Sequence, residues 1–339
     1  MSGLVITSRR DAVGILAIDN PPVNALSTPV ALELQAAVEA LENDEAIRAI
    51  VLIGTGRTFI AGADIREFLN LTLPPLNPLL NRIENCPKPV IAAIHGMALG
   101  GGLETAMACH YRVATADAQV GQPEVKLGLI PGAGGTQRLP RLVGLRKAML
   151  MCIFGEPINA TEALACGIVD EIVEGDLLES AVAFGRRGSP VRRTRDRELT
   201  KEEELVLGSM DDVLIARRAA MEAIKAAATL PFDEGMRREA ELFDKCLHSD
   251  QSKALIHVFF GERDVAKRWG AGVLESNRAF VDRLTAAHRD GRATEEGARI
   301  LEEDATLRPV DIDILAIHSC SFPRWLGGPM WQTGRDQKT

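Results

Sequence analysis

Two glutamates follow glycine-rich turns in the middle of the chain, in settings where a carboxylate can move protons. Glu104 comes just after Gly100-Gly101-Gly102, where a helical pattern begins, and Glu124 follows Gly121-Gln122-Pro123, a turn sequence that can aim it at the same place. The first N–H groups of a helix have no intrahelical partner, and glycine lets a ligand atom approach them closely. An oxygen that becomes negative during a reaction would be stabilised there. The spacing therefore predicts one site with backbone donors and two acids.

The elements around these glutamates fit such a site. An apolar run at 89–94 predicts a buried strand, so strand, turn and helix follow one another. The simpler alternative is a tight turn with two surface charges, because short glycine motifs often match by chance. Two further stretches favour the functional interpretation: Gly62-Ala63-Asp64 after an apolar segment, and the 130–136 stretch Ile-Pro-Gly-Ala-Gly-Gly-Thr. In this order and spacing, the four segments resemble the enoyl-CoA hydratase/isomerase (crotonase) family over residues 5 to 190.

The resemblance implies roles for individual residues. The N–H groups of Ala63 and Gly101 would form an oxyanion hole for a thioester oxygen, Glu104 would activate water, and Glu124 would deliver a proton. The residues implied to line the substrate and coenzyme A site are Ala61, Gly62, Asp64, Ile65, Arg66 and Gly132. Two of them have simpler alternatives, Asp64 as a helix cap and Arg66 as a solvated surface charge.

The reaction that the resemblance implies is hydration of a trans-2-enoyl-CoA to a 3-hydroxyacyl-CoA, as in fatty-acid β-oxidation. One carboxylate would hold and deprotonate water while the other protonates the α-carbon. Two alternatives stay open: a Δ3,Δ2-enoyl-CoA isomerase, which needs one proton-shuttling carboxylate, and a non-catalytic acyl-CoA-binding or assembly subunit. The backbone donors would hold the oxygen, so we expect no metal, and coenzyme A enters as part of the substrate.

Composition narrows the class of protein. The 339 residues carry a net charge of −8, which argues against a nucleic-acid partner. The sequence has neither a long apolar run nor a charged-then-apolar N-terminus, so we expect a soluble protein with no membrane partner. The six cysteines are scattered without CxxC spacing, which favours reduced thiols in a cytoplasmic protein over a disulfide framework or a zinc site.

Alternating elements predict the fold of the first part of the chain. Apolar strands are expected at 4–7, 13–19 and 49–53, and a helix is expected to start at Ser27 with Pro29 in its first turn. This alternation of apolar strands and helices predicts a layered α/β domain. The resemblance sharpens that fold class to α/β with a crotonase-type ββα spiral core and an all-α C-terminal extension.

Three positions between 110 and 170 carry further expectations. His110 stands where the family commonly has Asp, and we interpret it as structural. Asn159 is expected to cap a short helix, after which 167–170 should return as a strand.

Domain organisation is predicted from a change in composition. Residues 186–197 hold six arginines with Gly188, Ser189 and Pro190, which is typical of a linker; a patch for coenzyme A phosphates or a membrane is the alternative. We predict a crotonase domain at 1–190 and a helical linker segment at 191–275, helical from 201 onward. A helical remnant of a 3-hydroxyacyl-CoA dehydrogenase C-terminal domain is predicted at 276–339. The last two segments resemble parts of multifunctional fatty-acid β-oxidation enzymes, through stretches such as Glu239-Ala240-Glu241-Leu242-Phe243 and Phe322-Pro323-Arg324-Trp325.

No dinucleotide site is expected. Gly270-Ala271-Gly272 lacks the third glycine and the preceding strand of a nucleotide-binding fingerprint, and the chain beyond it is too short for an NAD domain. We therefore expect no bound NAD and no dehydrogenase activity. Crotonase relatives usually form trimers or dimers of trimers and multifunctional relatives can be monomers, so a homo-oligomer (trimer or hexamer) and a monomer both stay open.

Overall fold

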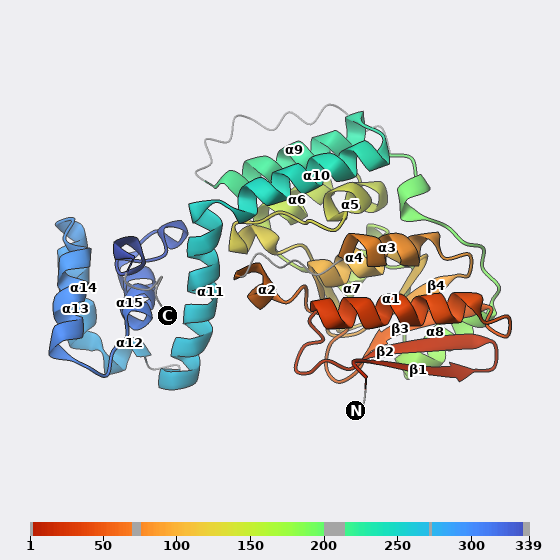
Figure 1. Cartoon of the computed structure of the whole chain (residues 1–339), viewed down its shortest axis with the longest axis horizontal. Helices are drawn as coiled ribbons and strands as arrows, with labels where there is room; N and C mark the ends of the chain where they lie inside the picture. Colours follow the sequence, from red (N-terminus) through yellow and green to blue (C-terminus); the bar gives the residue numbers. More distant parts are fainter. Residues whose placement is uncertain (1–2, 70–75, 200–213, 271–272, 335–339) are drawn as a thin grey trace. The chain divides into compact units, whose positions relative to one another are not determined.

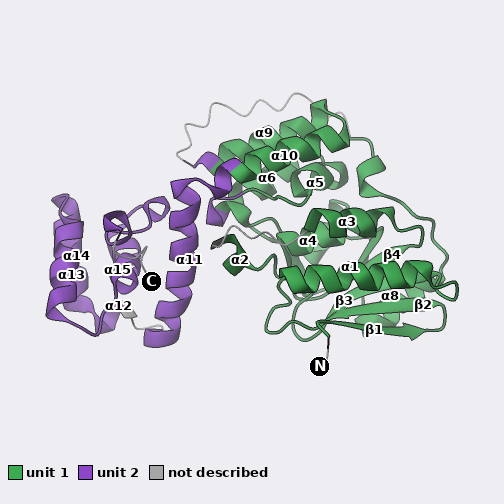
Figure 2. Cartoon of the chain, viewed as in Figure 1, with its two compact units in different colours: residues 1–125, 130–212, 216–244 green, residues 126–129, 213–215, 245–339 purple. Residues whose placement is uncertain are grey.

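The computed structural model describes residues 3–69, 76–199, 214–270 and 273–334. The chain forms two compact units, which Figure 2 distinguishes by colour. Unit 1 comprises residues 1–125, 130–212 and 216–244, and unit 2 comprises residues 126–129, 213–215 and 245–339. Each unit has its own apolar core.

A six-stranded sheet is the framework of unit 1, in the order β1-β2-β3-β4-β6-β9. Its strands are β1 (Val5–Arg10), β2 (Val13–Ile18), β3 (Ala49–Gly54), β4 (Val90–Ile94), β6 (Tyr111–Thr115) and β9 (Glu171–Val173). The first two strands pair antiparallel, and every other neighbouring pair is parallel. Strands β3 and β4 are buried along almost their whole length, as expected of parallel strands with both faces covered.

A smaller sheet, in the order β5-β7-β8, positions the glycine turns. Its strands are β5 (Met97–Leu99), β7 (Gln119–Gly121) and β8 (Ile158–Asn159). Strands β5 and β7 are parallel, and Leu99 stands opposite Gly121 in their register. The turns that lead to Glu104 and Glu124 therefore leave adjacent strands at the same end of the sheet, which brings two carboxylates 20 residues apart in sequence into one place.

Helices cover the large sheet and complete unit 1 (Figure 1). They are α1 (Thr28–Asn43), α2 (Ile65–Leu69), α3 (Leu76–Asn85), α4 (Gly101–Ala108), α5 (Gly135–Val143), α6 (Leu145–Phe154), α7 (Ala160–Ala165), α8 (Leu177–Arg186), α9 (Ile215–Thr229) and α10 (Phe232–Leu247), with short 3-10 turns at Glu124–Leu127 and Thr194–Asp196. Apolar side chains of α8 pack with those of the strands in one buried cluster. The α/β class, the crotonase-type core and the helical C-terminal part are as predicted.

Local predictions in unit 1 are mostly confirmed. Helix α1 starts after Ser27 with proline in its first turn, although the Ser27 side chain makes no capping hydrogen bond. Asn159 caps α7 by accepting from the N–H of Glu162 at 2.9 Å. The strand predicted at 167–170 is wrong, and β9 begins only at Glu171. Gly167 has a left-handed φ of 85° and the next two N–H groups donate to Ala163, so this segment closes α7 instead of pairing in a sheet.

The arginine-rich stretch is tied to unit 1 by ion pairs. Four of its arginines pair with acids elsewhere in the unit: Arg186 with Asp11, Arg187 with Glu171, Arg192 with Asp170, and Arg195 with Asp233. The stretch therefore follows the surface of unit 1 with much of its charge already matched, which weakens the alternative of a phosphate-binding or membrane-binding patch.

Unit 2 is helical. Its helices are α11 (Asp250–Trp269), α12 (Val273–Ser276), α13 (Arg278–Arg289), α14 (Ala293–Glu303) and α15 (Pro309–Cys320), followed by 3-10 turns at Arg324–Leu326 and Trp331–Thr333. Apolar residues of α13, α14 and α15 close around Met330 to form its core. The part of the predicted helical pattern at 201–213, and Ala271-Gly272 of the glycine stretch, lie outside the described residues. Within the described ranges, no helix has the length and apolar character needed to span a membrane.

The two units divide the chain differently from the three predicted segments, 1–190, 191–275 and 276–339. Helix α9 and most of α10, which we assigned to a linker, belong with the sheets of unit 1. The three segments stay a prediction about the origin of each part. The structure adds that residues 216–244 help to build the unit that holds the candidate site.

Candidate active site

The N–H groups of Ala63 and Gly101 lie close together. Leu26 and Ala63 form a parallel bridge in which Leu26 donates to Gly62 and Asp64 donates to Leu26, so the N–H of Ala63 faces the other way. On that side stands Gly101, where a Cβ would lie 3.3 Å from the Ala63 nitrogen. Among the described residues, no carbonyl accepts from either N–H group. The two N–H groups are therefore close together and have no carbonyl partner among the described residues, as the predicted oxyanion hole requires.

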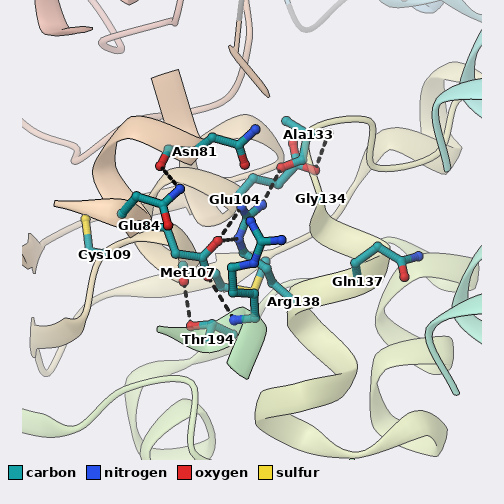
Figure 3. A network of polar contacts seen from close by, with 12 residues as sticks. Asn81, Glu84, Glu104, Met107, Cys109, Ala133, Gly134, Gln137, Arg138 and Thr194 are labelled. Carbon is teal, nitrogen blue, oxygen red and sulfur yellow. Dashed lines mark hydrogen bonds and ion pairs between the residues drawn. The ribbon is translucent and has the colours of Figure 1, made fainter. Parts of the chain in front are cut away.

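Glu104, in the first turn of α4, is 3% exposed. Its Oε1 accepts from the N–H groups of Ala133 and Gly135, both at 2.8 Å. Figure 3 shows Glu104 beside the loop at Ala133 and Gly134. The two donors hold one oxygen and leave Oε2 without a donor from the part of the chain that the structure describes.

Glu124 sits beside the start of α4. A Cβ on Gly100 would lie 3.0 Å from Glu124 Oε1, so a side chain there would crowd the carboxylate, and the left-handed φ of 52° at Gly100 also favours glycine. The buried amide of Gln122, with its nitrogen turned toward Glu124, donates to Oε1 at 3.0 Å and to Oε2 at 3.3 Å. Gln122 is therefore a direct contact of Glu124, although the sequence predicted it only as part of a turn.

The two glutamates differ in their electrostatic surroundings. Burial raises the pKa of Glu104, and the two backbone donors with the Arg138 charge oppose that rise. Burial raises the pKa of Glu124 well above its usual value, and the charges of Glu104 and Glu239 add to the rise. Neighbouring acids with unequal surroundings tend to divide into one proton donor and one acceptor. Of the two, Glu124 has the larger rise in pKa, so it is the better placed to act as the proton donor.

Another buried carboxylate, Glu239 of α10, contacts the loop at residues 133–136. It is fully buried and accepts from the N–H groups of Gly134 at 2.6 Å and Thr136 at 2.9 Å, and from the Thr136 hydroxyl at 2.5 Å. Burial and the charge of Glu104 raise the pKa of Glu239 to about 8. No role was predicted for Glu239, and only the spacing of Gly235, Glu239 and Phe243 along one helix face could have indicated it.

The other predicted binding residues make local contacts around α2 and the 130–136 segment. Asp64 accepts from the Arg66 N–H at 3.0 Å, which is a capping contact at the start of α2, and also pairs with the exposed Arg66 side chain at 2.6 Å. The Arg66 partner lowers the pKa of Asp64. Ala61 and Gly62 form the segment before Ala63, and Ile65 opens α2. Gly132 accepts from Asn77, and a Cβ on it would lie 2.5 Å from the Phe243 ring.

His110 is structural, as the sequence analysis interpreted it. Its Nδ1 accepts from the Val90 N–H at 2.9 Å, and its Nε2 donates to the Glu84 carbonyl at 3.0 Å. Burial lowers the pKa of His110, which favours the neutral ring that these contacts require.

A buried ion pair contacts the loop at residues 133–136. Arg138 of α5 and Glu84 of α3 pair at 2.7 Å, and both side chains are fully buried. Arg138 also donates to the Ala133 carbonyl at 3.0 Å, next to the amide that holds Glu104 (Figure 3). Glu84 in turn accepts from the Arg195 N–H at 2.9 Å. Within the described residues, no group of three or more His, Cys, Asp or Glu side chains is arranged to hold a metal.

The fold and this site define a class of protein. Residues 8–189 match the model of a family described as enoyl-CoA hydratase/isomerase, which is more than half of the chain. The chain therefore belongs to the enoyl-CoA hydratase/isomerase family.

Individual relatives agree with that assignment. The chain is 39% identical over 261 residues to a Bacillus subtilis protein named "Probable enoyl-CoA hydratase", and this match covers 74% of the chain and 93% of the relative. A crystal structure of an enoyl-CoA hydratase from Mycobacterium avium subsp. paratuberculosis has a TM-score of 0.58 and 26% identity, and covers 77% of this chain and 96% of that one.

Longer relatives match as well. The human peroxisomal bifunctional enzyme is 40% identical over 282 residues, which is 78% of this chain but 38% of the human protein. A zebrafish (Danio rerio) enzyme of the same name is 41% identical over 272 residues, again 38% of its length. The chain thus spans about two fifths of the bifunctional relatives that it matches.

Proposed function

We propose that this chain hydrates trans-2-enoyl-CoA thioesters to 3-hydroxyacyl-CoA in fatty-acid β-oxidation. The observation that carries the proposal is the pair of glutamates, buried Glu104 and half-buried Glu124, in the turns that follow adjacent parallel strands. They lie beside two N–H groups, of Ala63 and Gly101, that have no carbonyl partner among the described residues. Relatives named for enoyl-CoA hydration and for β-oxidation support it.

In this mechanism the thioester carbonyl accepts from the N–H groups of Ala63 and Gly101. Both donors are strongest when the oxygen carries the negative charge of an enolate, so they stabilise the transition state more than the substrate. Glu104 accepts a proton from water through its free oxygen, and the resulting hydroxide adds to the β-carbon. Glu124 gives its proton to the α-carbon, and the proton left on Glu104 restores the pair through solvent. Water is thereby added with no net change in the enzyme.

We propose that Ala61, Gly62, Asp64, Ile65 and Arg66 form the rim along which coenzyme A lies, with Gly132 on the opposite side. Arg66 is the group in this segment that could meet a phosphate, because its side chain is 76% exposed. The mechanism uses backbone donors and carboxylates for every step, so it needs neither a metal nor bound NAD. The thioester is substrate.

A second activity at the same site is Δ3,Δ2-enoyl-CoA isomerisation. The observation that favours it is the raised pKa of Glu124, because a carboxyl that is less acidic than usual is better suited to take a proton from one carbon and return it to another, here between C2 and C4. A binding or assembly subunit without turnover would make no use of two carboxylates oriented by Gln122 and by the loop amides. We propose dehydrogenase activity for neither unit.

The assembly and the location are also proposals. Both a homo-oligomer (trimer or hexamer) and a monomer are compatible with the chain, and sedimentation of the purified protein separates them. The scattered cysteines favour the cytoplasm, whereas several relatives are named peroxisomal or glyoxysomal.

One set of assays tests the function. The purified chain is incubated with 2-enoyl-CoAs and, separately, 3-enoyl-CoAs of several chain lengths, each with and without NAD. We expect loss of the 2-enoyl absorbance without NADH formation. Acyl-CoA binding with no turnover would replace the hydratase by the binding-subunit alternative, and conversion of 3-enoyl substrates alone would replace it by the isomerase.

A further inference from the structure

Helix α10 lies along the loop that holds Glu104. A Cβ on Gly235 would lie 2.1 Å from Gln137 Oε1, so a side chain at this position would displace Gln137. One turn later Glu239 meets Gly134 and Thr136, and after another turn the Phe243 ring meets Gly132. Residues four apart share one face of a helix, so one face of α10 contacts the loop along its length.

The loop amides alternate between two carboxylates. The N–H groups of Ala133 and Gly135 donate to Glu104, and those of Gly134 and Thr136 donate to Glu239. The four-residue segment is therefore held between two acids on opposite sides. Any shift that moves one set of donors moves the other, because the peptide units between them are rigid.

The 133–136 segment and the two acids that hold it, Glu104 and Glu239, are called the clamp below. Further hydrogen bonds connect the clamp to α9. The Thr136 hydroxyl donates to Glu239 and accepts from Gln137 Nε2 at 3.0 Å. The same nitrogen of Gln137 donates to the Ala223 carbonyl of α9 at 2.9 Å. Thr136, Gln137 and Glu239 are all fully buried, so solvent cannot replace a partner that is removed.

We propose that Glu239 is a positioning residue, which holds the 133–136 segment so that the donors of that segment fix Glu104 for the attack of water. This inference rests on the hydratase activity proposed above and extends its machinery to α10. Glu239 does not touch the reacting atoms and acts only through the loop. Residues that the sequence pattern assigned to a linker thereby become part of the catalytic unit.

The charges that face Glu239 are those of the site itself. They are Glu104 of α4, Glu124 and, through the loop, Arg138 of α5, with the buried Cys152 thiol of α6 nearby. Because the pKa of Glu239 is about 8, loss of its proton adds a negative charge next to Glu104 in the range where hydratases are assayed. A positioning role therefore gives the turnover of the native chain an inflection near that pH.

The test compares Glu239→Gln with the matched control Glu241→Gln, two positions along the same helix, where the side chain is 63% exposed and pairs with Arg238. Either protonation state of Glu239 can accept both backbone donors, whereas a glutamine amide can accept only one of them. We expect kcat on a short 2-enoyl-CoA to fall about 10²-fold in Glu239→Gln, as for other remote displacements of a catalytic group. KM should change little, since no substrate contact is removed.

The pH dependence of kcat is the measurement that a purely structural role of Glu239 would leave unchanged. We expect the inflection near pH 8 in the native chain and in Glu241→Gln, and its absence in Glu239→Gln. A kcat for Glu239→Gln within about threefold of native, or an unchanged inflection, would overturn the inference while leaving the hydratase proposal intact. A native chain with no hydration would instead overturn the proposed function.

A second variant keeps the test decisive if Glu239→Gln does not fold. Thr136→Val keeps the shape and the backbone N–H and removes only the hydroxyl that meets Glu239 at 2.5 Å. We expect a smaller fall in kcat, about tenfold, with KM unchanged. A native kcat in a folded Thr136→Val protein would count against the clamp, and a fall in kcat at constant KM would support it.

Discussion

The candidate site in unit 1 and the helical unit 2 both bury carboxylates, and they satisfy them with different partners, although unit 1 also holds a buried ion pair between Glu84 and Arg138. In unit 1, Glu104 and Glu239 accept from backbone N–H groups and, within the described residues, make no ion pair. In unit 2, Asp311 and Asp313 are equally buried, but each meets a basic side chain: Asp311 pairs with Arg308 at 2.7 Å and Asp313 with His257 at 3.1 Å.

The difference separates a site that can exchange protons from a structural anchor. A neighbouring cation holds a carboxylate as an anion, whereas neutral donors in a buried place leave the charged and neutral forms closer in free energy. Asp313 also accepts from the N–H groups of Met330 at 2.6 Å and Trp331 at 3.1 Å, which fixes the last described turn. We therefore expect changes at the two sets of acids to affect different properties.

The largest effect is expected at Glu124. Glu124→Gln keeps the shape and removes the proton that reaches the α-carbon, so kcat for hydration should fall about 10³-fold, within the range for loss of a general acid. Circular dichroism should be unchanged. The control Glu179→Gln alters a surface ion pair with Arg10 and should be native in both respects. Near-native turnover of Glu124→Gln on crotonyl-CoA would remove Glu124 from the mechanism.

A smaller loss is expected at the oxyanion hole. In Gly101→Ala the new methyl would lie 3.3 Å from the Ala63 nitrogen, in the space that a thioester oxygen must enter. We expect kcat/KM to fall about 10²-fold, as for loss of one oxyanion donor. Gly185→Ala is the control, because its methyl meets the Ala49 side chain at the same 3.3 Å distance in α8. Equal activity of the two variants would contradict the assignment.

A change in unit 2 should have the opposite consequence, in which the protein loses stability and keeps its hydratase activity. Asp313→Asn replaces one acceptor oxygen of a buried group that meets His257 and two backbone N–H groups, so unit 2 should lose about 2 kcal/mol of unfolding free energy, as for a buried hydrogen-bonding group left unsatisfied. Urea unfolding followed by tryptophan fluorescence measures this, because all three tryptophans, Trp269, Trp325 and Trp331, belong to unit 2. The exposed control is Asp290→Asn. A fall in hydratase kcat would show that the two kinds of carboxylate are not independent.

The last prediction is a pH dependence of stability in unit 1, which needs no substitution to be seen. The pKa of Glu239 rises from 4.5 to about 8 on folding, so between these values the folded state binds more protons than the unfolded state. Stability then decreases as the pH rises through this window and levels off above it. Calorimetric Tm should fall from pH 5 to pH 9, by roughly 2–4 °C for each kcal/mol, and Glu239→Gln should flatten the slope. A slope of opposite sign in the native chain would contradict the raised pKa.

The sequence predicted the parts of the site that follow from local chemistry. The apolar strand, the Gly100-Gly101-Gly102 turn and the helix after it are encoded within 20 residues. This pattern predicted Gly101 and Glu104, and the turn before Glu124 and the family resemblance added Glu124 and Ala63. The prediction of a strand at 167–170 was wrong, and the reason is also local. Apolar residues after a glycine can close a helix as readily as they can pair in a sheet.

Glu239 could not be found in this way. Its contacts with Gly134 and Thr136 join residues 105 and 103 positions apart, so they exist only once α10 has packed against the loop. Charged residues in an amphipathic helix are usually assigned to the solvent face, and nothing in the composition of α10 marks this one as buried. Gln122 was missed for a different reason, since its role depends on the direction of one side chain within a turn.

The alternation of donors along residues 133–136 also limits how this segment can change in length. Inserting or deleting one residue before Ala133 would exchange the partners, so that each amide now facing Glu104 would face Glu239. The donors would still be present but would point at the wrong acid. We therefore expect variation here to be tolerated as substitutions of side chains and rejected as single-residue gaps.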